Sequence, residues 1–263
     1  MSPFRLTAAL AVAIAVGLLW SGLGESGRPG TAPSTSALRS LPGAPASALE
    51  IGPPERLTSS RFLSRWTVVR RPVLARDAPS AKGLVVAELQ ARTPEKTPNA
   101  VGVLRSKADR HGEVWVKVQL PILPNGSAGW VRRPALGAYE TVDTRLLVDR
   151  RTLRATLYRA GKPIFSAPVG VGTSAWPTPA GHFIVRSELT RYASAFYGPI
   201  AFGTNARSAV LTDWPAGGFV GIHGTDDPQL LPGRVSHGCI RMRNADIRRL
   251  AKLMPVGTAL TIR

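Results

Sequence analysis

The chain has 263 residues, of which 44% are hydrophobic and only 6% are aromatic. This length allows one or two domains, and the hydrophobic fraction excludes a chain that is disordered throughout. The 26 glycines and 23 prolines favour short strands and turns over a helical bundle. The 34 basic and 16 acidic side chains give a formal net charge of +18, and the single cysteine excludes an intramolecular disulfide.

The first 24 residues have the pattern of an export segment. Arg5 precedes an apolar run from Leu6 to Trp20, and small residues follow at positions 21, 22 and 24. A basic start, an apolar centre and a small-residue exit are typical of a secretory signal, although a membrane anchor that is not cleaved remains an alternative. For residues 1–24 we therefore predict export, which places the protein in the cell wall or at the outer face of the cytoplasmic membrane.

Residues 25–64 are rich in Pro, Ala, Ser, Gly and Thr and contain few residues that could form a core. Such a composition is typical of a flexible and partly extended linker. We therefore predict a disordered tether here, which would hold a folded part of the protein away from a membrane or wall.

Residues 65–140 contain short hydrophobic segments separated by turn signals. In residues 113–120, valines alternate with Trp115 and Lys117, as a half-buried strand requires. The Asn-Gly pair at 125–126 predicts a hairpin. Several short strands of this kind predict a small β-barrel. The hairpin makes the segment resemble the bacterial Src-homology-type barrel that occurs beside cell-wall enzymes, and the resemblance implies a wall-binding role.

Residues 141–263 form a second predicted domain with strands at 145–152, 155–161, 163–172, 181–189, 208–214, 219–224 and 259–263. One helix is predicted near the C-terminus: Asn244 is suited to cap its start, and Pro255 and Gly257 end it. The predicted fold is therefore mainly β, with a β-sandwich or barrel-like domain that carries one short helix. The aromatic segment 191–204 predicts a loop over a cleft. Five aromatic residues either line that cleft or pack in the core: Trp176, Trp214, Tyr192, Phe196 and Tyr197.

The single cysteine and a preceding histidine are the candidate reactive groups. Cys239 lies in the segment VSHGCIRM, and His223 lies upstream in the segment GIHGT. A thiol becomes a strong nucleophile when it loses its proton, and a nearby imidazole can accept that proton. We therefore predict Cys239 as nucleophile and His223 as its base, oriented by a backbone carbonyl such as that of Gly224. Gly238 permits a sharp turn, so that the N–H groups of residues 238 and 239 could stabilise an oxyanion.

Other interpretations of these residues remain open. A lone cysteine is often a buried structural residue. His223, His237 and Cys239 are also residue types that bind metals, but no fourth ligand is evident and we predict no metal. His237 either props the loop before the cysteine or takes part directly in the chemistry.

The two motifs together resemble the signature of a known family. The segments IHGT and SHGCIRM are similar to those of the L,D-transpeptidase catalytic domain family (YkuD-like), and residues 169–183 (VGVGTSAWPTPAGHF) resemble its Gly-Thr…Pro-Thr-Pro-x-Gly segment. The resemblance covers about residues 143 to 263. Many members of this family carry Asn where Arg241 stands.

The resemblance implies a peptidoglycan L,D-transpeptidase that needs no metal or organic cofactor. Cys239 would attack the carbonyl of the third residue of a stem peptide, D-Ala would leave, and a thioester would form. An amine of a second stem would then attack the thioester and complete a 3→3 cross-link. His223 would move the protons, and Cys239 is expected to be acylated by carbapenems. Further residues are expected to bind substrate or shape the pocket: Ser236, His237, Gly238, Arg241, Gly224 and Tyr197.

Two other functions remain open at this point. Water could resolve the same thioester, which would make the protein an L,D-carboxypeptidase. Alternatively, the protein could be a non-catalytic wall-binding protein whose working part is the small barrel. The net charge of +18 fits anionic wall polymers better than nucleic acid for an exported protein, and basic side chains that merely solvate the surface explain it equally well.

Overall fold

The structure is a computed structural model that describes residues 55–57, 62–190, 194–211 and 218–263. The chain divides into two units, Met1–Ser47 and Ala48–Arg263, and every described residue belongs to the second. The predicted export segment and most of the predicted linker therefore lie outside the described residues. Among the residues that the structure does describe, no helix is long and apolar enough to span a membrane.

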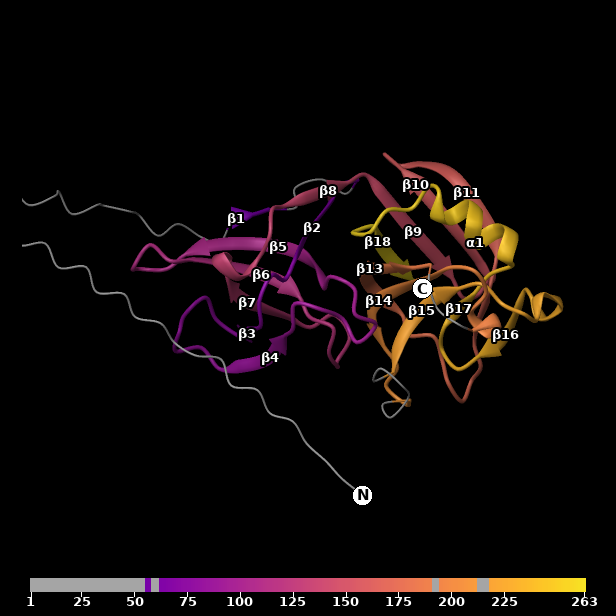
Figure 1. Ribbon diagram of the computed structural model, residues 1–263, viewed down its shortest axis with the longest axis horizontal. Coiled ribbons are helices and arrows are strands. Elements are labelled where there is room, and N and C mark those ends of the chain that lie inside the picture. Colours follow the sequence, from indigo (N-terminus) through magenta and orange to yellow (C-terminus); the bar gives the residue numbers. More distant parts are fainter. Residues whose placement is uncertain (1–54, 58–61, 191–193, 212–217) are drawn as a thin grey trace, which may run out of the picture. The chain divides into compact units, whose positions relative to one another are not determined.

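The described residues form two β-sheets (Figure 1). We call the first the N-terminal sheet; its strands are β1 (Glu55–Arg56), β2 (Ser64–Val68), β3 (Val73–Arg76), β4 (Val85–Leu89), β5 (Ala100–Ala108), β6 (Val114–Gln119), β7 (Ala128–Arg132) and β8 (Glu140–Val142). They follow the order β4-β3-β7-β6-β5-β2-β8, with β1 paired to β5. The short strand β1 lies within the segment predicted as a linker. The 3₁₀ helix η1 (Arg133–Ala135) follows β7.

The predicted hairpin around the Asn-Gly pair is confirmed. Strands β6 and β7 pair antiparallel, and Gly126 in the connection has a φ of +89°, which glycine adopts without steric cost. The Asn125 amide donates to the Arg207 carbonyl at 2.7 Å, and its Oδ1 accepts the Arg207 N–H at 2.9 Å. The tip of this hairpin is therefore bonded to the last residue of a strand in the second sheet.

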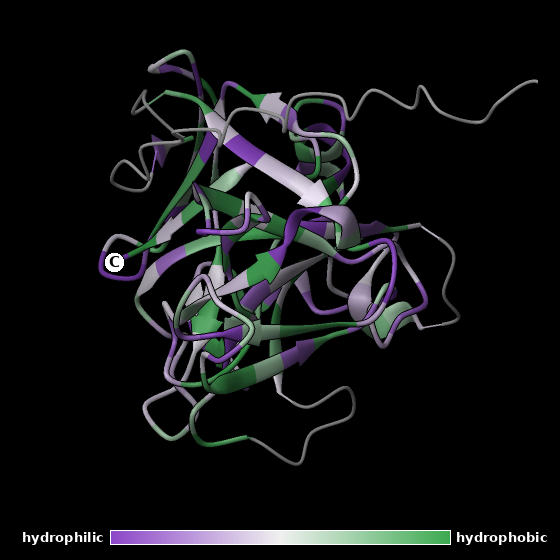
Figure 2. Cartoon of the chain, turned by 90° about the vertical axis from the view of Figure 1, so that its left-hand side faces the viewer, coloured by the Kyte–Doolittle hydropathy of each residue, from purple (hydrophilic) through white to green (hydrophobic). Residues whose placement is uncertain are grey.

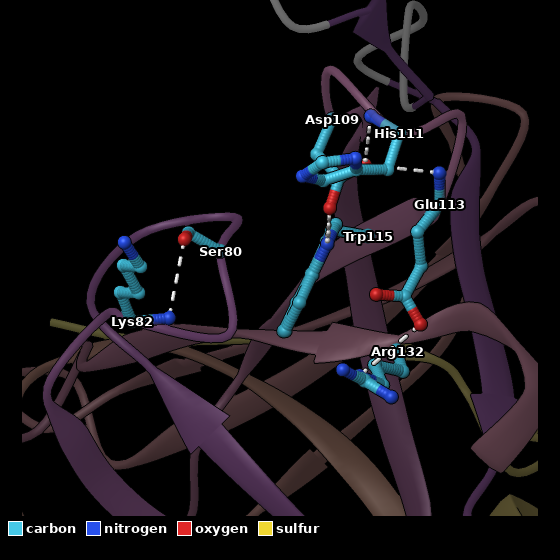
Figure 3. A network of polar contacts seen from close by, with 7 residues as sticks. All are labelled: Ser80, Lys82, Asp109, His111, Glu113, Trp115 and Arg132. Carbon is cyan, nitrogen blue, oxygen red and sulfur yellow. Dashed lines mark hydrogen bonds and ion pairs between the residues drawn. The ribbon is translucent and has the colours of Figure 1, made fainter.

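A polar network encloses the buried Trp115 of β6 (Figure 3). Trp115 Nε1 donates to Asp109 Oδ2 at 3.1 Å, while Asp109 Oδ1 accepts the backbone N–H groups of His111 and Glu113 at 2.9 and 3.0 Å. The Arg132 guanidinium lies 5.5 Å from the Trp115 ring and pairs with Glu113 at 3.2 Å. This network holds the turn between β5 and β6.

We call the second sheet the C-terminal sheet; its strands are β9 (Thr144–Asp149), β10 (Arg154–Arg159), β11 (Lys162–Pro168), β12 (Gly170–Gly172), β13 (Gly181–Leu189), β14 (Ala201–Arg207), β15 (Phe219–His223), β16 (Gly233–Ser236), β17 (Ile240–Arg241) and β18 (Ala259–Ile262). The strands follow the order β11-β10-β9-β18-β13-β14-β15-β17-β12-β16. Two 3₁₀ helices, η2 (Ala195–Tyr197) and η3 (Pro228–Leu230), lie in the connections. The fold is mainly β, as predicted. Figure 2 shows that hydrophobic and hydrophilic residues share strands of the described chain.

The strand predicted at 208–214 is wrong where the structure describes it. Residues 208–211 leave the sheet, because the Ser208 hydroxyl accepts the N–H groups of Val210 and Leu211 and forms a turn. The strand lies earlier, as β14, partly within the segment predicted as a loop. Gly203 and Asn205 give β14 a weak strand signal in the sequence, but pairing with β13 and β15 on its two sides stabilises it.

The predicted helix is confirmed as α1 (Asn244–Ala251), the one α-helix of the described residues. Its residues Ile247 and Leu250 are fully buried in the core of the C-terminal sheet. The capping residue is Arg243 and not Asn244 as predicted. The Asn244 Oδ1 instead accepts the Thr225 N–H at 3.0 Å, which ties the start of the helix to the loop after β15.

Candidate active site

Two segments that are distant in sequence bring Cys239 and His223 to neighbouring strands in the interior of the C-terminal sheet. His223 ends β15, Cys239 directly precedes β17, and the two strands pair in parallel with His223 opposite Arg241. This register aligns Gly221 with the cysteine, so that the Gly221 N–H donates to Cys239 Sγ at 3.4 Å. A backbone donor on the sulfur stabilises a thiolate more than a thiol. Nothing in the sequence motif itself had indicated this role for Gly221.

The His223 ring is held in one orientation. Its side chain is only 2% exposed, and Nδ1 lies 2.6 Å from the Gly224 carbonyl oxygen. Because a carbonyl can only accept, Nδ1 carries the proton and Nε2 is the basic nitrogen. The contact between His223 and the Gly224 carbonyl is thus confirmed. Gly224 must be glycine, since a Cβ there would collide with Asn244 Oδ1.

The environment favours the neutral forms of both reactive groups. Burial, aided by the positive charge of Arg241, lowers the pKa of His223 from 6.5 to about 4. Burial raises the pKa of Cys239, although the Gly221 N–H and Arg241 oppose that shift. At neutral pH the resting site therefore holds a thiol and a neutral imidazole. The thiolate arises only as the proton leaves the sulfur.

Ser236 and Gly238 shape the turn that presents the cysteine. The Ser236 hydroxyl donates to the Cys239 carbonyl at 2.5 Å and accepts the Gly238 N–H at 3.1 Å. Gly238 has a φ of +114°, which side chains other than that of glycine rarely permit. The Gly238 N–H, predicted as an oxyanion donor, is engaged by Ser236 here, which leaves the Cys239 N–H as the candidate donor.

Residues 172–178, at the end of β12 and after it, also hold this turn through hydrogen bonds. The Thr178 hydroxyl donates to the Gly238 carbonyl at 2.8 Å and accepts the Gly172 N–H at 2.8 Å. The Thr173 N–H donates to the Ser236 carbonyl at 3.0 Å. The family resemblance had drawn attention to residues 169–183, but the brace by Thr178 could not be inferred from the sequence.

A small pocket opens over the cysteine and is lined by Tyr197, Phe219, His223, Cys239 and Arg241, among others. The Tyr197 ring meets the His223 ring edge-on at 4.8 Å, and Ser236 and His237 also line the pocket. The structure therefore brings together seven of the eight predicted site residues as pocket lining or, for Gly238, as part of the turn below it. Gly224 contributes its carbonyl instead.

Aromatic side chains surround the pocket and are not part of the core. The exposed ring of His237 lies 4.4 Å from that of Trp176, which is itself 37% exposed. Phe196 is 40% exposed and lies over the Arg241 guanidinium. The cleft-lining alternative therefore holds for Phe196 and Tyr197. The predictions for Tyr192 and Trp214 lie outside the described residues.

Metal binding was an open alternative for the histidines and the cysteine. In the part of the chain that the structure describes, no group of at least three His, Cys, Asp or Glu side chains is arranged to hold a metal ion.

Comparison with known proteins addresses the family. The profile of the YkuD L,D-transpeptidase catalytic domain matches residues 143–262. The protein named L,D-transpeptidase YkuD in Bacillus licheniformis is 33% identical over 131 residues, which cover 49% of this chain and 71% of that protein. Its namesake in Bacillus subtilis is 31% identical over 129 residues, with the same coverage of 49% and 71%. The chain belongs to the YkuD family of L,D-transpeptidases.

Solved structures of L,D-transpeptidases are also similar to part of this chain. The catalytic domain of the L,D-transpeptidase from E. faecium is 25% identical and has a TM-score of 0.36, covering 46% of this chain and 97% of that domain. Members of this family are cysteine acyltransferases.

Proposed function

We propose that this protein forms 3→3 cross-links between peptidoglycan stem peptides through a thioester on Cys239. One observation carries the proposal: the thiol and a buried imidazole with Nδ1 bonded to the Gly224 carbonyl line the same pocket. That arrangement supplies a nucleophile and a base in the tautomer that leaves Nε2 free to accept a proton.

In the first step, Cys239 Sγ attacks the carbonyl carbon of the third residue of the donor stem. The thiol proton passes to His223 Nε2, and the Cys239 N–H is the candidate donor to the oxyanion. The intermediate collapses as the carbon–nitrogen bond to the fourth residue, a D-amino acid, breaks. The proton on His223 goes to the leaving amine, so that a neutral imidazole and a thioester remain.

In the second step, an amine of the acceptor stem attacks the thioester carbonyl. His223 Nε2 takes a proton from the attacking nitrogen, the carbon–sulfur bond breaks, and the sulfur recovers the proton. The two stems are then joined by a new amide bond. If water takes the place of the amine, the product is a tripeptide stem and the enzyme acts as an L,D-carboxypeptidase.

We further assign residues 141–263 to catalysis and propose that residues 1–24 export the protein to the wall. L,D-transpeptidases act on peptidoglycan stems, and one of them, LdtMt1, has been solved in complex with imipenem. We accordingly expect carbapenems to acylate Cys239. The N-terminal sheet is the candidate wall-binding part, and anionic wall polymers are the partners that the net charge of +18 favours.

Incubation with purified tetrapeptide stems tests this function. The proposal predicts cross-linked dimers and released D-amino acid, with no product from Cys239→Ala. Tripeptide without dimers would identify a hydrolase, and neither product from wild-type protein would contradict an enzymatic role. Deletion of residues 65–140 tests the alternative that the protein is a non-catalytic wall-binding protein. On that alternative the deletion abolishes wall binding, and neither the full chain nor the shortened one catalyses a reaction.

A further inference from the structure

Arg241 shares one face of the site with the reactive groups. It lies two residues after Cys239, and side chains at that spacing along an extended chain point to the same side. It is also the register partner of His223 on the neighbouring strand. Both relations place the guanidinium beside the sulfur and the imidazole, and all three side chains line the pocket.

The Arg241 guanidinium is buried without a partner for its charge. The residue is only 7% exposed, and its Nε has no hydrogen-bond acceptor. Among the described residues, no carboxylate or other acceptor bonds to this group, and no Asp or Glu lines the pocket. The guanidinium lies over the Phe196 ring, with its central carbon 4.6 Å from the ring centroid.

A second buried arginine in the same sheet provides a contrast. Arg186 donates through one terminal nitrogen to Asn99 Oδ1 at 3.2 Å, a bond for which Arg241 has no counterpart among the described residues, although the Nε of both arginines has no acceptor there. Burying a cation without such an acceptor is costly, and an anion that enters from outside the protein would offset that cost. The position of Arg241 in the pocket indicates where that anion binds.

We propose that Arg241 binds the free carboxylate of the D-amino acid that leaves the donor stem, an inference that rests on the proposed function. In such a donor only the nitrogen and the α-carbon of the leaving residue separate its carboxylate from the carbonyl that Cys239 attacks. Cys239 and Arg241 are correspondingly close neighbours on one face. A planar guanidinium can bind a carboxylate with two parallel hydrogen bonds, and the Phe196 ring restricts its orientation.

This contact would select the length and the terminus of the donor. A tetrapeptide stem with a free terminal carboxylate places its charge on Arg241. A terminal amide removes the charge, and a pentapeptide moves it one residue further from the scissile bond. Both are therefore expected to be poor donors.

A purely electrostatic role for Arg241 makes a different prediction. Its charge also opposes the rise in the pKa of Cys239, and that effect acts on every donor equally. Only a direct contact makes the effect of substituting Arg241 depend on the terminal group of the donor.

The test measures the rate of acyl-enzyme formation with a tetrapeptide stem and with the same stem as its terminal amide. We expect wild-type protein to prefer the free acid by roughly 10- to 100-fold, the range for a charge-assisted hydrogen bond. Arg241→Met should abolish the preference, and Arg241→Lys should retain part of it because the charge remains. Arg248→Met, which removes a charge from the exposed side of α1, is the matched control and should keep the full preference.

Equal rates for the two donors in the wild-type protein overturn this inference alone, as does a preference that persists in a folded Arg241→Met variant. If Arg241→Met does not fold, the preference for the free acid is compared between wild-type protein and Arg241→Lys. An unchanged preference in Arg241→Lys then overturns the inference. No acyl-enzyme from either donor in wild-type protein overturns the proposed function and this inference with it.

Discussion

Two clusters of polar side chains in this protein use similar residue types in opposite ways. In the N-terminal sheet, the groups around Trp115 satisfy one another: the indole N–H and two backbone N–H groups all donate to Asp109, and Arg132 pairs with Glu113 (Figure 3). Around Cys239, an imidazole is buried in its neutral form, and the Arg241 Nε has no acceptor among the residues that the structure describes. A satisfied cluster stabilises a turn, whereas an unsatisfied one is ready for a ligand or a proton.

The difference also appears in the direction of the pKa shifts. Hydrogen bonds, first of all that from Trp115, lower the pKa of Asp109, which keeps it ionised as the acceptor of its network. Burial shifts Cys239 and His223 away from their charged forms. The site therefore has less stability than a satisfied cluster could supply, which is common at functional sites.

The largest expected effect comes from Cys239→Ala. Removing the nucleophile should abolish cross-linking and thioester formation, because no other thiol exists in the chain. The fold should persist, since the substitution removes one partly buried atom. Circular dichroism and turnover assays check the two parts, and residual turnover by a folded variant would end the nucleophile assignment.

The second effect is a pH dependence of stability caused by His223. The unfolded chain binds a proton on this histidine below about pH 6.5, while the folded protein does so only below about pH 4. Because the unfolded state then binds more protons, the free energy of unfolding should fall as the pH is lowered through that window, by about 3 kcal/mol.

Denaturant titrations of wild-type protein and His223→Gln between pH 7 and pH 4 measure this difference. The variant should lose less stability on acidification than the wild-type protein. Parallel curves for the two proteins would show that His223 is not buried in its neutral form.

The third effect concerns the brace of the cysteine turn. Thr178→Val keeps the side-chain shape but removes the hydrogen bonds to the Gly238 carbonyl and the Gly172 N–H. We expect a loss of about 2 kcal/mol in the free energy of unfolding and a drop in kcat of about 10-fold, because the turn that presents Cys239 is loosened. Thr156→Val, at a half-buried position of β10, serves as the control, since the Thr156 hydroxyl bonds to Ser166 and lies outside the cysteine turn.

The smallest effect is expected in the N-terminal sheet. Glu113→Gln breaks the half-exposed ion pair with Arg132 and should lower the free energy of unfolding by less than about 1 kcal/mol. Cross-linking activity should not change. A several-fold fall in activity would show that the cluster around Trp115 affects the reaction, and would contradict its purely structural role.

The sequence could single out Cys239 and His223 because both sit in short motifs, and the structure places both in the lining of one pocket. The histidine-orienting carbonyl of Gly224 could be predicted too, since it lies next to His223 in the chain. The Gly221 N–H on the sulfur and the Thr178 brace depend on pairings between strands that are distant in sequence. Local patterns do not encode such pairings.

The same dependence on contacts between distant residues explains where the fold predicted from the sequence was wrong. The helix and most strands follow from local periodicity, but β14 depends on its neighbours β13 and β15 more than on its own glycine and asparagine residues. Asn244 has the side chain of a helix cap, yet its oxygen bonds to Thr225 in the loop after His223. A tertiary contact replaced the local one in both cases.

The most direct test of the account is the mass of the intact protein after exposure to a tetrapeptide stem without an acceptor, followed by peptide mapping. The account predicts an adduct of the tripeptide acyl group, located on Cys239 and released by an added amine. An unmodified protein that nevertheless consumes the stem, or an adduct on any other residue, would contradict it.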